Sequence, residues 1–350
     1  MARILVGSCS WTDPTLIACG RFYPPGVTSA EARLRYYATQ FPLVEVDSTY
    51  YAPPSERNSR LWLERTPDGF VFNVKAFGLL TGHPARAERL PAWLREAVAP
   101  AARTKKNVYR KNVAEDAVER LWEVHRSALE PLRAAGRLGA VLFQFPPWFV
   151  RGPGNERYLR ELPGRLPGMT VAVEFRGGGW MDDDAAPATL RLLEDAGLAY
   201  VSVDEPQGFR SSTPPVVAAT APLAVARLHG RNAETWELRT GAASDRFKYL
   251  YAERELAEWV TRVRALEERA QTVHVLFNNN FEDWGMRNAR RMTQLLGGAP
   301  AGELPDGDMT HAAAASGDVA VEGVATSAGG GAAGARPTDE APDGPQGSLL

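Results

Sequence analysis

The chain has 350 residues, of which 44% are hydrophobic, and its 40 basic and 42 acidic residues give a formal net charge of −2. This content suffices for one large folded domain, and the lack of any run of eighteen apolar residues predicts that nothing spans a membrane. Residues 301–350 hold eight acids and one base, which leaves +5 on residues 1–300, a mild bias toward anionic partners that falls short of a dedicated nucleic-acid binder.

The first residues of the chain predict its compartment. Residues 1–7 enter a strand pattern directly, without the long apolar stretch and cleavage site of a signal peptide. Cys9 and Cys19 form neither a disulfide framework nor a Cys-x-x-Cys motif. We therefore expect a cytoplasmic protein.

Eight short runs along the chain are typical of strands, namely residues 4–7, 43–47, 70–75, 139–144, 170–176, 199–204, 223–229 and 272–278. Helical periodicity between them is clearest over residues 30–41, 116–135, 187–196, 253–268 and 284–296. Strands that alternate with helices pair in parallel through right-handed crossovers, so eight units predict an α/β fold, a closed (β/α)₈ TIM barrel over residues 3–297. An open doubly wound sheet is the alternative, but no Gly-x-Gly-x-x-Gly follows the first strand.

Two segments fall outside this repeat. A long excursion separates the third and fourth strands, and five bases within residues 103–112 make it a candidate for tracking phosphates, with a solvated loop as the alternative. Residues 301–350 are rich in Ala, Gly, Asp and Pro and contain no aromatic residue. Such a composition buries too little apolar surface to fold, so we expect a disordered tail.

Side chains alternate along the predicted strands. One parity is apolar and should face outward beneath the helices: Val44, Val46, Phe70, Phe72, Val74, Val171, Val173, Phe175, Val201, Val203, Val273, Val275 and Phe277. The other parity becomes polar toward the C-terminal strand ends: Glu45, Asp47, Asn73, Lys75, Gln144, Glu174, Arg176, Ser202, Asp204, Arg227, His229 and Asn278. Because barrel active sites occupy that rim, this pattern predicts a polar pocket there.

Several strand-end motifs carry a family resemblance: Gly7-Ser8-Cys9-Ser10-Trp11, Glu45-Val46-Asp47-Ser48, Phe143-Gln144-Phe145-Pro146-Pro147, Glu174-Phe175-Arg176, Arg227-Leu228-His229-Gly230-Arg231 and Phe277-Asn278-Asn279. In these the chain resembles the YecE-like family, a bacterial domain of unknown function. The resemblance implies a TIM barrel and brings no established activity. The chain departs from the family at Cys9, where Gly is frequent, and at Gly177, where His is frequent, so a mechanism that requires that His cannot operate here.

The carboxylates of Glu45, Glu174 and Asp204 can divide general acid and base roles at the mouth if their environments split their pKa values. Alternatively, they form structural ion pairs with the cations Lys75, Arg176 and Arg227. Cations that are not paired with these carboxylates would instead bind a phosphate or carboxylate ligand.

His229 ends the seventh predicted strand and can shuttle a proton, ligate a metal or donate to a neighbouring carbonyl. Glu45, Glu174, Asp204 and His229 together would suit a divalent metal ion, but the adjacent cations oppose one, so we expect no cofactor.

The remaining candidates would bind the ligand. Gln144 and Asn278 supply amides on the inward parity, with turn formation as the alternative role of Asn278. Trp11, Tyr50, Tyr51 and Trp180 follow strand ends and could stack on a sugar or base, or simply pack their loops.

Three functions remain open at this point. The first is an enzyme, a hydrolase, lyase or isomerase, that applies acid–base chemistry to a small anionic ligand such as a phosphorylated sugar. The second is a metal-dependent phosphodiester enzyme on nucleic acid, similar in arrangement to barrel endonucleases, in which residues 103–112 would border the pocket. The third is a binding barrel without catalysis. The fold alone does not choose among them, and nothing in the sequence predicts the oligomeric state.

Overall fold

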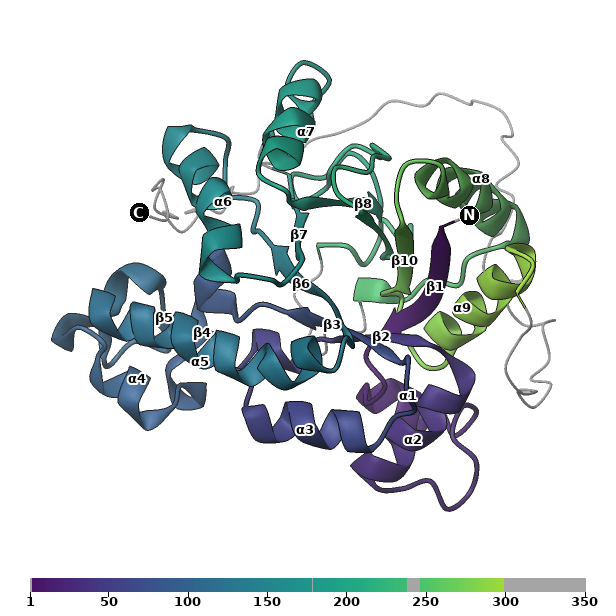
Figure 1. Cartoon of the computed structure of the whole chain (residues 1–350), viewed down its shortest axis with the longest axis horizontal. Helices are drawn as coiled ribbons and strands as arrows, with labels where there is room; N and C mark the ends of the chain where they lie inside the picture. Colours follow the sequence, from purple (N-terminus) through teal and green to yellow (C-terminus); the bar gives the residue numbers. More distant parts are fainter. Residues whose placement is uncertain (1, 178, 238–245, 299–350) are drawn as a thin grey trace, which may run out of the picture.

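The computed structural model describes residues 2–177, 179–237 and 246–298. Eight parallel strands close into a barrel in the order β1-β10-β9-β8-β7-β6-β3-β2 (Figure 1). These strands are β1 Arg3–Cys9, β2 Leu43–Val46, β3 Val71–Lys75, β6 Leu138–Gln144, β7 Val171–Glu174, β8 Ala199–Asp204, β9 Leu223–Leu228 and β10 Thr272–Phe277. The predicted TIM barrel is confirmed, and the predicted tail at residues 301–350 lies outside the described residues.

Helices cover most of the outside of the barrel, and one of the nine α-helices of the described residues, α4 (Ala92–Glu96), lies in a lobe beside it. They are α1 Pro14–Ala18, α2 Ala30–Gln40, α3 Glu56–Glu64, α4 Ala92–Glu96, α5 Glu115–Ala134, α6 Pro153–Arg165, α7 Ala186–Asp195, α8 Glu253–Glu267 and α9 Trp284–Leu295. Serines begin two of them, since the Ser29 and Ser55 hydroxyls accept bonds from backbone N–H groups of α2 and α3 that have no helical partner. In the described part of the chain, no helix has the length and apolar character that crossing a bilayer requires.

The predicted excursion separates β3 from β6. It carries α4 and a two-stranded antiparallel ribbon of β4 Ala85–Arg86 and β5 Asn107–Val108. Figure 1 shows β4, β5 and α4 together beside α5, at one side of the barrel. The excursion therefore adds a small lobe next to the loops that follow β3.

Two apolar clusters divide the interior. The barrel itself encloses Leu5, Cys9, Leu43, Val71, Ala140, Leu142, Ala172, Ala199, Val201, Val203, Leu223, Val225 and Leu276. The larger outer cluster lies between strands and helices and includes Val44, Phe72, Val173 and Val275, as the alternation predicts. The expected facing of β2, β3, β7 and β10 is confirmed.

The expected facing of β8 is wrong. Val201 and Val203 belong to the inner cluster, so Ser202 and Asp204 face outward. The segment between β8 and β9 contains no helix, and its extended chain covers the outer face of β8: the Ala218 N–H donates to the Ser202 hydroxyl at 3.3 Å. A backbone cover offers polar groups that a helix face does not, so a polar outer face on this strand is satisfied.

Candidate functional site

The Arg227 guanidinium joins two strands at the C-terminal end of the barrel interior. Arg227 is fully buried on β9, and its Nη2 donates to Glu45 Oε1 at 2.5 Å across the barrel. Its Nη1 bonds Glu174 Oε2, and the Cys9 sulfur lies 3.5 Å from Nη2. One buried cation therefore links two buried carboxylates, and the two-acid, one-arginine group is the centre of the site.

Glu174 is the most heavily bonded member of this group. Its Oε1 accepts from the Gln144 amide at 2.6 Å and from Arg176 Nε at 2.9 Å, and it lies 3.2 Å from His229 Nε2. Burial alone would raise the pKa of Glu174, but the two arginines and His229 outweigh it and hold the pKa well below its ordinary value. Glu174 is a fixed anion that orients its four neighbours.

The pKa of Glu45 is shifted in the opposite direction to that of Glu174. Burial raises the pKa of Glu45 to about 7, against the attraction of Arg227 and with the added repulsion of Asp47. Its Oε2 is buried and has no hydrogen-bond partner among the described residues. The two carboxylates that share Arg227 thus differ in pKa direction, and Glu45 keeps one oxygen uncommitted.

His229 closes one side of the group as a neutral ring. Its Nδ1 accepts from the Asn278 amide at 2.8 Å, which leaves Nε2 to carry the ring proton toward Glu174. Burial and the nearby Arg176 lower the pKa of His229 to about 3. Asn278 and His229 are therefore brought together with Glu174, as their inward parity predicts.

Sequence reasoning missed Glu205. Its Oε2 accepts from Arg176 Nη1 at 2.6 Å, and its Oε1 accepts from the Thr213 N–H at 2.6 Å. Burial raises the pKa of Glu205 to about 7. The inward parity of Val201 and Val203 continues to Glu205, one residue beyond β8, so the correct facing of the strand is the signal that would have found it.

Asp204, the predicted acid, lies elsewhere. Its carboxylate accepts from Arg231 Nε at 2.9 Å and also contacts the Tyr251 hydroxyl, on the outward side of β8. The four donors considered for a metal ion are therefore not assembled. Among the described residues, no three histidine, cysteine or acidic side chains gather as ligands for one ion.

Lys75 occupies the mouth beside β2. Its Nζ lies 3.5 Å from Asp47 Oδ1 and 5.0 Å from the centre of the Tyr50 ring. Lys75 also attracts the Glu45 carboxylate electrostatically. Of the three predicted cations of the mouth, Lys75 is thus the one that is not hydrogen-bonded to Glu174, and its side chain is 13% exposed.

The predicted stacking residues separate into two groups. Trp11 packs edge-on against Trp62 of α3, and Trp180 stacks on Phe175, so both belong to the outer core. Tyr51 is 48% exposed at the rim and contacts Tyr50 edge-on. A role for Trp11 or Tyr51 in binding a ligand stays a prediction.

The basic stretch at residues 103–112 lies in the excursion lobe, where residues 103–107 are exposed. β5 holds part of it against β4, and from the same lobe the Arg89 guanidinium lies 5.6 Å above the Tyr51 ring. The lobe thus contacts the rim through Arg89. A role of residues 103–112 in phosphodiester binding stays a prediction.

The structure explains why residue 177 is a glycine. Its φ is +74°, and a Cβ at this position would lie 2.2 Å from the Arg210 carbonyl oxygen. Its N–H donates to the Thr213 hydroxyl at 3.1 Å, in the segment that also holds Glu205. A histidine does not fit here without displacing that segment, so this chain uses the close backbone approach in place of a side chain.

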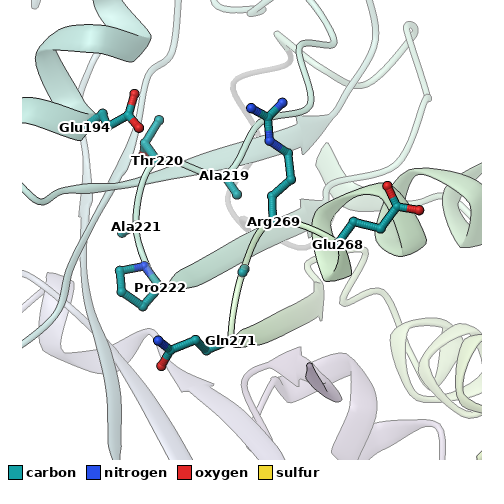
Figure 2. Close-up of a pocket in the computed structure, with 9 residues that line it drawn as sticks. Glu194, Ala219, Thr220, Ala221, Pro222, Glu268, Arg269 and Gln271 are labelled. Atoms are coloured by element: carbon teal, nitrogen blue, oxygen red, sulfur yellow. The ribbon is translucent and has the colours of Figure 1, made fainter. Parts of the chain in front are cut away.

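Two hollows of the described structure lie at the other end of the barrel. One of about 480 Å³ is lined by residues that directly precede β9 and β10, among them Pro222 and Gln271. Figure 2 shows the carboxylate of Glu194 and the guanidinium of Arg269 on separate stretches of its wall. The second, of about 410 Å³, includes Arg3. Neither touches the polar group at the mouth, whose side chains fill their own space by pairing with one another.

Comparisons with known proteins agree with the fold. Residues 5–310 match the model of a family described as "Protein of unknown function DUF72". The UPF0759 protein YunF of Bacillus subtilis is 31% identical over 297 residues, which cover 84% of this chain and 94% of YunF. The motif resemblance to a family of unknown function is thus supported under this description, and the label YecE-like stays a prediction.

Solved structures of the same description share the architecture. A DUF72 family protein of Thermotoga maritima is 28% identical with a TM-score of 0.65, over 84% of this chain and 99% of that protein. A DUF72 family protein of Enterococcus faecalis is 25% identical with a TM-score of 0.67, over 87% of this chain and 99% of that protein. None of these descriptions states an activity.

Proposed function

Because the chain belongs to the DUF72 family, whose description states no function, we propose a function from the geometry of the barrel mouth: acid–base chemistry on a small polar anion. One observation carries the proposal. Glu45 and Glu174 share the Arg227 guanidinium, yet their pKa values move in opposite directions. Paired carboxylates whose environments split their pKa values are the usual basis of acid and base roles at one site.

Glu45 is the proton-transfer group in this proposal. A general acid or base works best when its pKa lies near the working pH, and the pKa of Glu45 is about 7. Its Oε2 makes no hydrogen bond to the described residues, which leaves this oxygen available to give or take a proton. Glu174 keeps its charge and holds Arg176 and Arg227 in place.

The charges of the mouth favour an anionic substrate when Glu45 and Glu205 are protonated. Lys75, Arg176 and Arg227 supply three positive charges, and Glu174 and Asp47 supply two negative ones in formal terms. Protonated Glu45 and Glu205 leave the group at +1, whereas their ionisation brings it to −1. Since the pKa of each is about 7, an anion should bind together with proton uptake.

Sulfate tests the proposal because its own charge is constant over the relevant pH range. Titration calorimetry should show sulfate binding about tenfold or more weaker at pH 8.5 than at pH 6, as both carboxylates ionise. Glu45→Gln should reduce this pH dependence, and Lys75→Met should weaken binding at both pH values. Asp204→Asn, outside the group, is the matched control and should behave like the wild type.

Sulfate that does not bind, or that binds equally at pH 6 and 8.5, would overturn the proposal. Once a turnover assay exists, Glu45→Gln also separates an enzyme from a binding barrel. The enzyme should lose turnover with little loss of affinity, because the amide cannot transfer the proton.

A further inference from the structure

The exposed large apolar side chains of the described residues gather in one place. They are Tyr51, Trp148 and Val150, with 48%, 43% and 48% of their surface exposed. Tyr51 follows β2, and Trp148 and Val150 follow β6. In the barrel order only β3 separates β6 from β2, so all three lie along one arc of the C-terminal rim. Isolated exposed apolar residues are ordinary, but a group of them beside a polar site indicates contact with a ligand or partner.

A continuous row of rings connects the two ends of this arc. The Tyr51 ring lies 5.0 Å from Tyr50, Tyr50 lies 5.2 Å from His83, and His83 lies 5.8 Å from Trp148, each measured between ring centres. All three contacts are edge-to-face. We name Tyr50, Tyr51, His83 and Trp148 the aromatic row. Edge-to-face contacts turn neighbouring rings in different directions, and Tyr51 and Trp148 are the exposed members of the row.

The aromatic row is held in place. Trp148 Nε1 donates to the Gly82 carbonyl at 3.3 Å, and the His83 Nδ1 lies 2.8 Å from the Thr81 hydroxyl. Burial, with Lys75 and Arg176 nearby, lowers the pKa of His83 to about 3, so its ring is neutral at physiological pH. Because these side chains are already fixed, binding a ligand loses little of their conformational entropy, which favours their use as a stacking surface.

Cations flank this surface at two points. Lys75 Nζ lies 5.0 Å from the Tyr50 ring on the side of the mouth, and the Arg89 guanidinium lies 5.6 Å from the Tyr51 ring on the side of the excursion lobe. The row therefore adjoins the polar group through Lys75. A ligand that spans both features needs an acidic group for Lys75 and a flat ring for the exposed aromatics.

We infer that the substrate is a small anion that carries a planar aromatic ring, with the acidic group at Lys75 and the ring stacked on Trp148 and its neighbours. This inference rests on the proposed anion site and names the class of molecule that the site takes. A phosphorylated sugar, the example that the sequence suggested, has no aromatic ring and would leave the exposed aromatic side chains unused. Base–aromatic stacks contribute substantially to affinity and tolerate different ring systems, so several aromatic anions should bind.

Three probes separate the acidic group from the ring: adenosine 5′-monophosphate, ribose 5-phosphate and adenosine, titrated calorimetrically into the full chain at pH 6.5. The monophosphate should bind about tenfold or more tightly than ribose 5-phosphate, and adenosine should bind more weakly than the monophosphate. Trp148→Ala should remove the preference for the monophosphate and leave ribose 5-phosphate binding unchanged. Trp148→Phe should keep most of the preference. Trp93→Ala, on α4, is the matched control and should change neither affinity.

Each contrary result is distinct. Equal binding of the two phosphates, or a preference that survives Trp148→Ala, would overturn the inference and leave the anion site standing. Adenosine that binds as well as its monophosphate would overturn the link between row and anion site. A single-stranded oligonucleotide that binds far more tightly than the monophosphate, and depends on Lys105 and Lys106, would replace the small anion by a nucleic acid. No binding of either phosphate would overturn the proposed function as well.

Discussion

Arg227→Met removes the cation that the two buried carboxylates share. Breaking a buried ion pair by removal of one partner typically costs about 3–5 kcal/mol of folding free energy. We expect about 3 kcal/mol at pH 7, because Glu174 keeps Arg176 at 2.9 Å and Glu45 can take up a proton. Urea unfolding followed by circular dichroism measures the loss. Arg264→Met is the control, since Arg264 is an exposed partner of Glu267 and such pairs contribute about 0–1 kcal/mol.

The pH dependence of the Arg227→Met variant separates electrostatics from packing. Without Arg227, the already raised pKa of Glu45 should move above 7. A carboxyl with a raised folded-state pKa contributes stability below its unfolded pKa and loses it as pH rises toward the folded one. The variant should therefore lose up to about 1.4 kcal/mol per pH unit between pH 7 and 8, where the wild type has nearly finished losing this contribution. A second change, Glu45→Gln, should abolish that slope.

Two results would refute this reasoning. One is an Arg227→Met loss no larger than that of Arg264→Met. The other is an identical slope between pH 7 and 8 in the wild type, the single variant and the double variant. Either would mean that Arg227 does not hold Glu45 and Glu174 as an ion-paired unit.

Three further changes test other parts of the structure. His125 is fully buried on α5, and neither of its ring nitrogens bonds another described residue. Burial lowers its pKa to about 4, so its contribution to stability is complete above pH 6.5 and is lost as pH falls toward 4. His125→Leu should remove about 2 kcal/mol of the stability difference between pH 7.5 and 5 in urea unfolding, and an unchanged difference contradicts this. Gly177→Ala should destabilise more than Gly20→Ala, because both residues have positive φ but only Gly177 has a backbone oxygen 2.2 Å from the added carbon, and equal melting temperatures would exclude the clash. Glu205→Gln should strengthen sulfate binding at pH 8.5, because it removes a negative charge beside Arg176, whereas Asp204→Asn should leave the affinity unchanged. The reverse result would contradict the observed facing of β8.

Alternation within strands predicted most of the site because helices cover most of the barrel. Where a helix lies outside, the outer face must be apolar, so the polar parity faces inward; Glu45, Glu174 and Arg227 follow this rule. Their mutual pairing was left open by the sequence, since parity gives direction but not distance. The ion-pair alternative is the one that the contacts support, and it coexists with the unbonded oxygen of Glu45.

Alternation predicted the wrong facing for β8, because no helix covers the outside of this strand. Its outer neighbour is the extended connection between β8 and β9, which has no helical periodicity, and this segment lets Ser202 face outward. The exchange of Asp204 for Glu205 follows from that single reversal. Of the aromatic row, the sequence suggested Tyr50 and Tyr51 as stacking residues but not their partners. His83 and Trp148 come from loops 65 residues apart in sequence that only the closed barrel brings together.

The split between the two glutamates is the central claim, and carboxyl-carbon NMR of glutamate-labelled protein measures it directly, with Glu45→Gln and Glu174→Gln assigning the signals. Glu45 should titrate with a midpoint near pH 7, while Glu174 stays ionised below pH 4.5. Two signals that both titrate near the ordinary glutamate pKa would contradict the account.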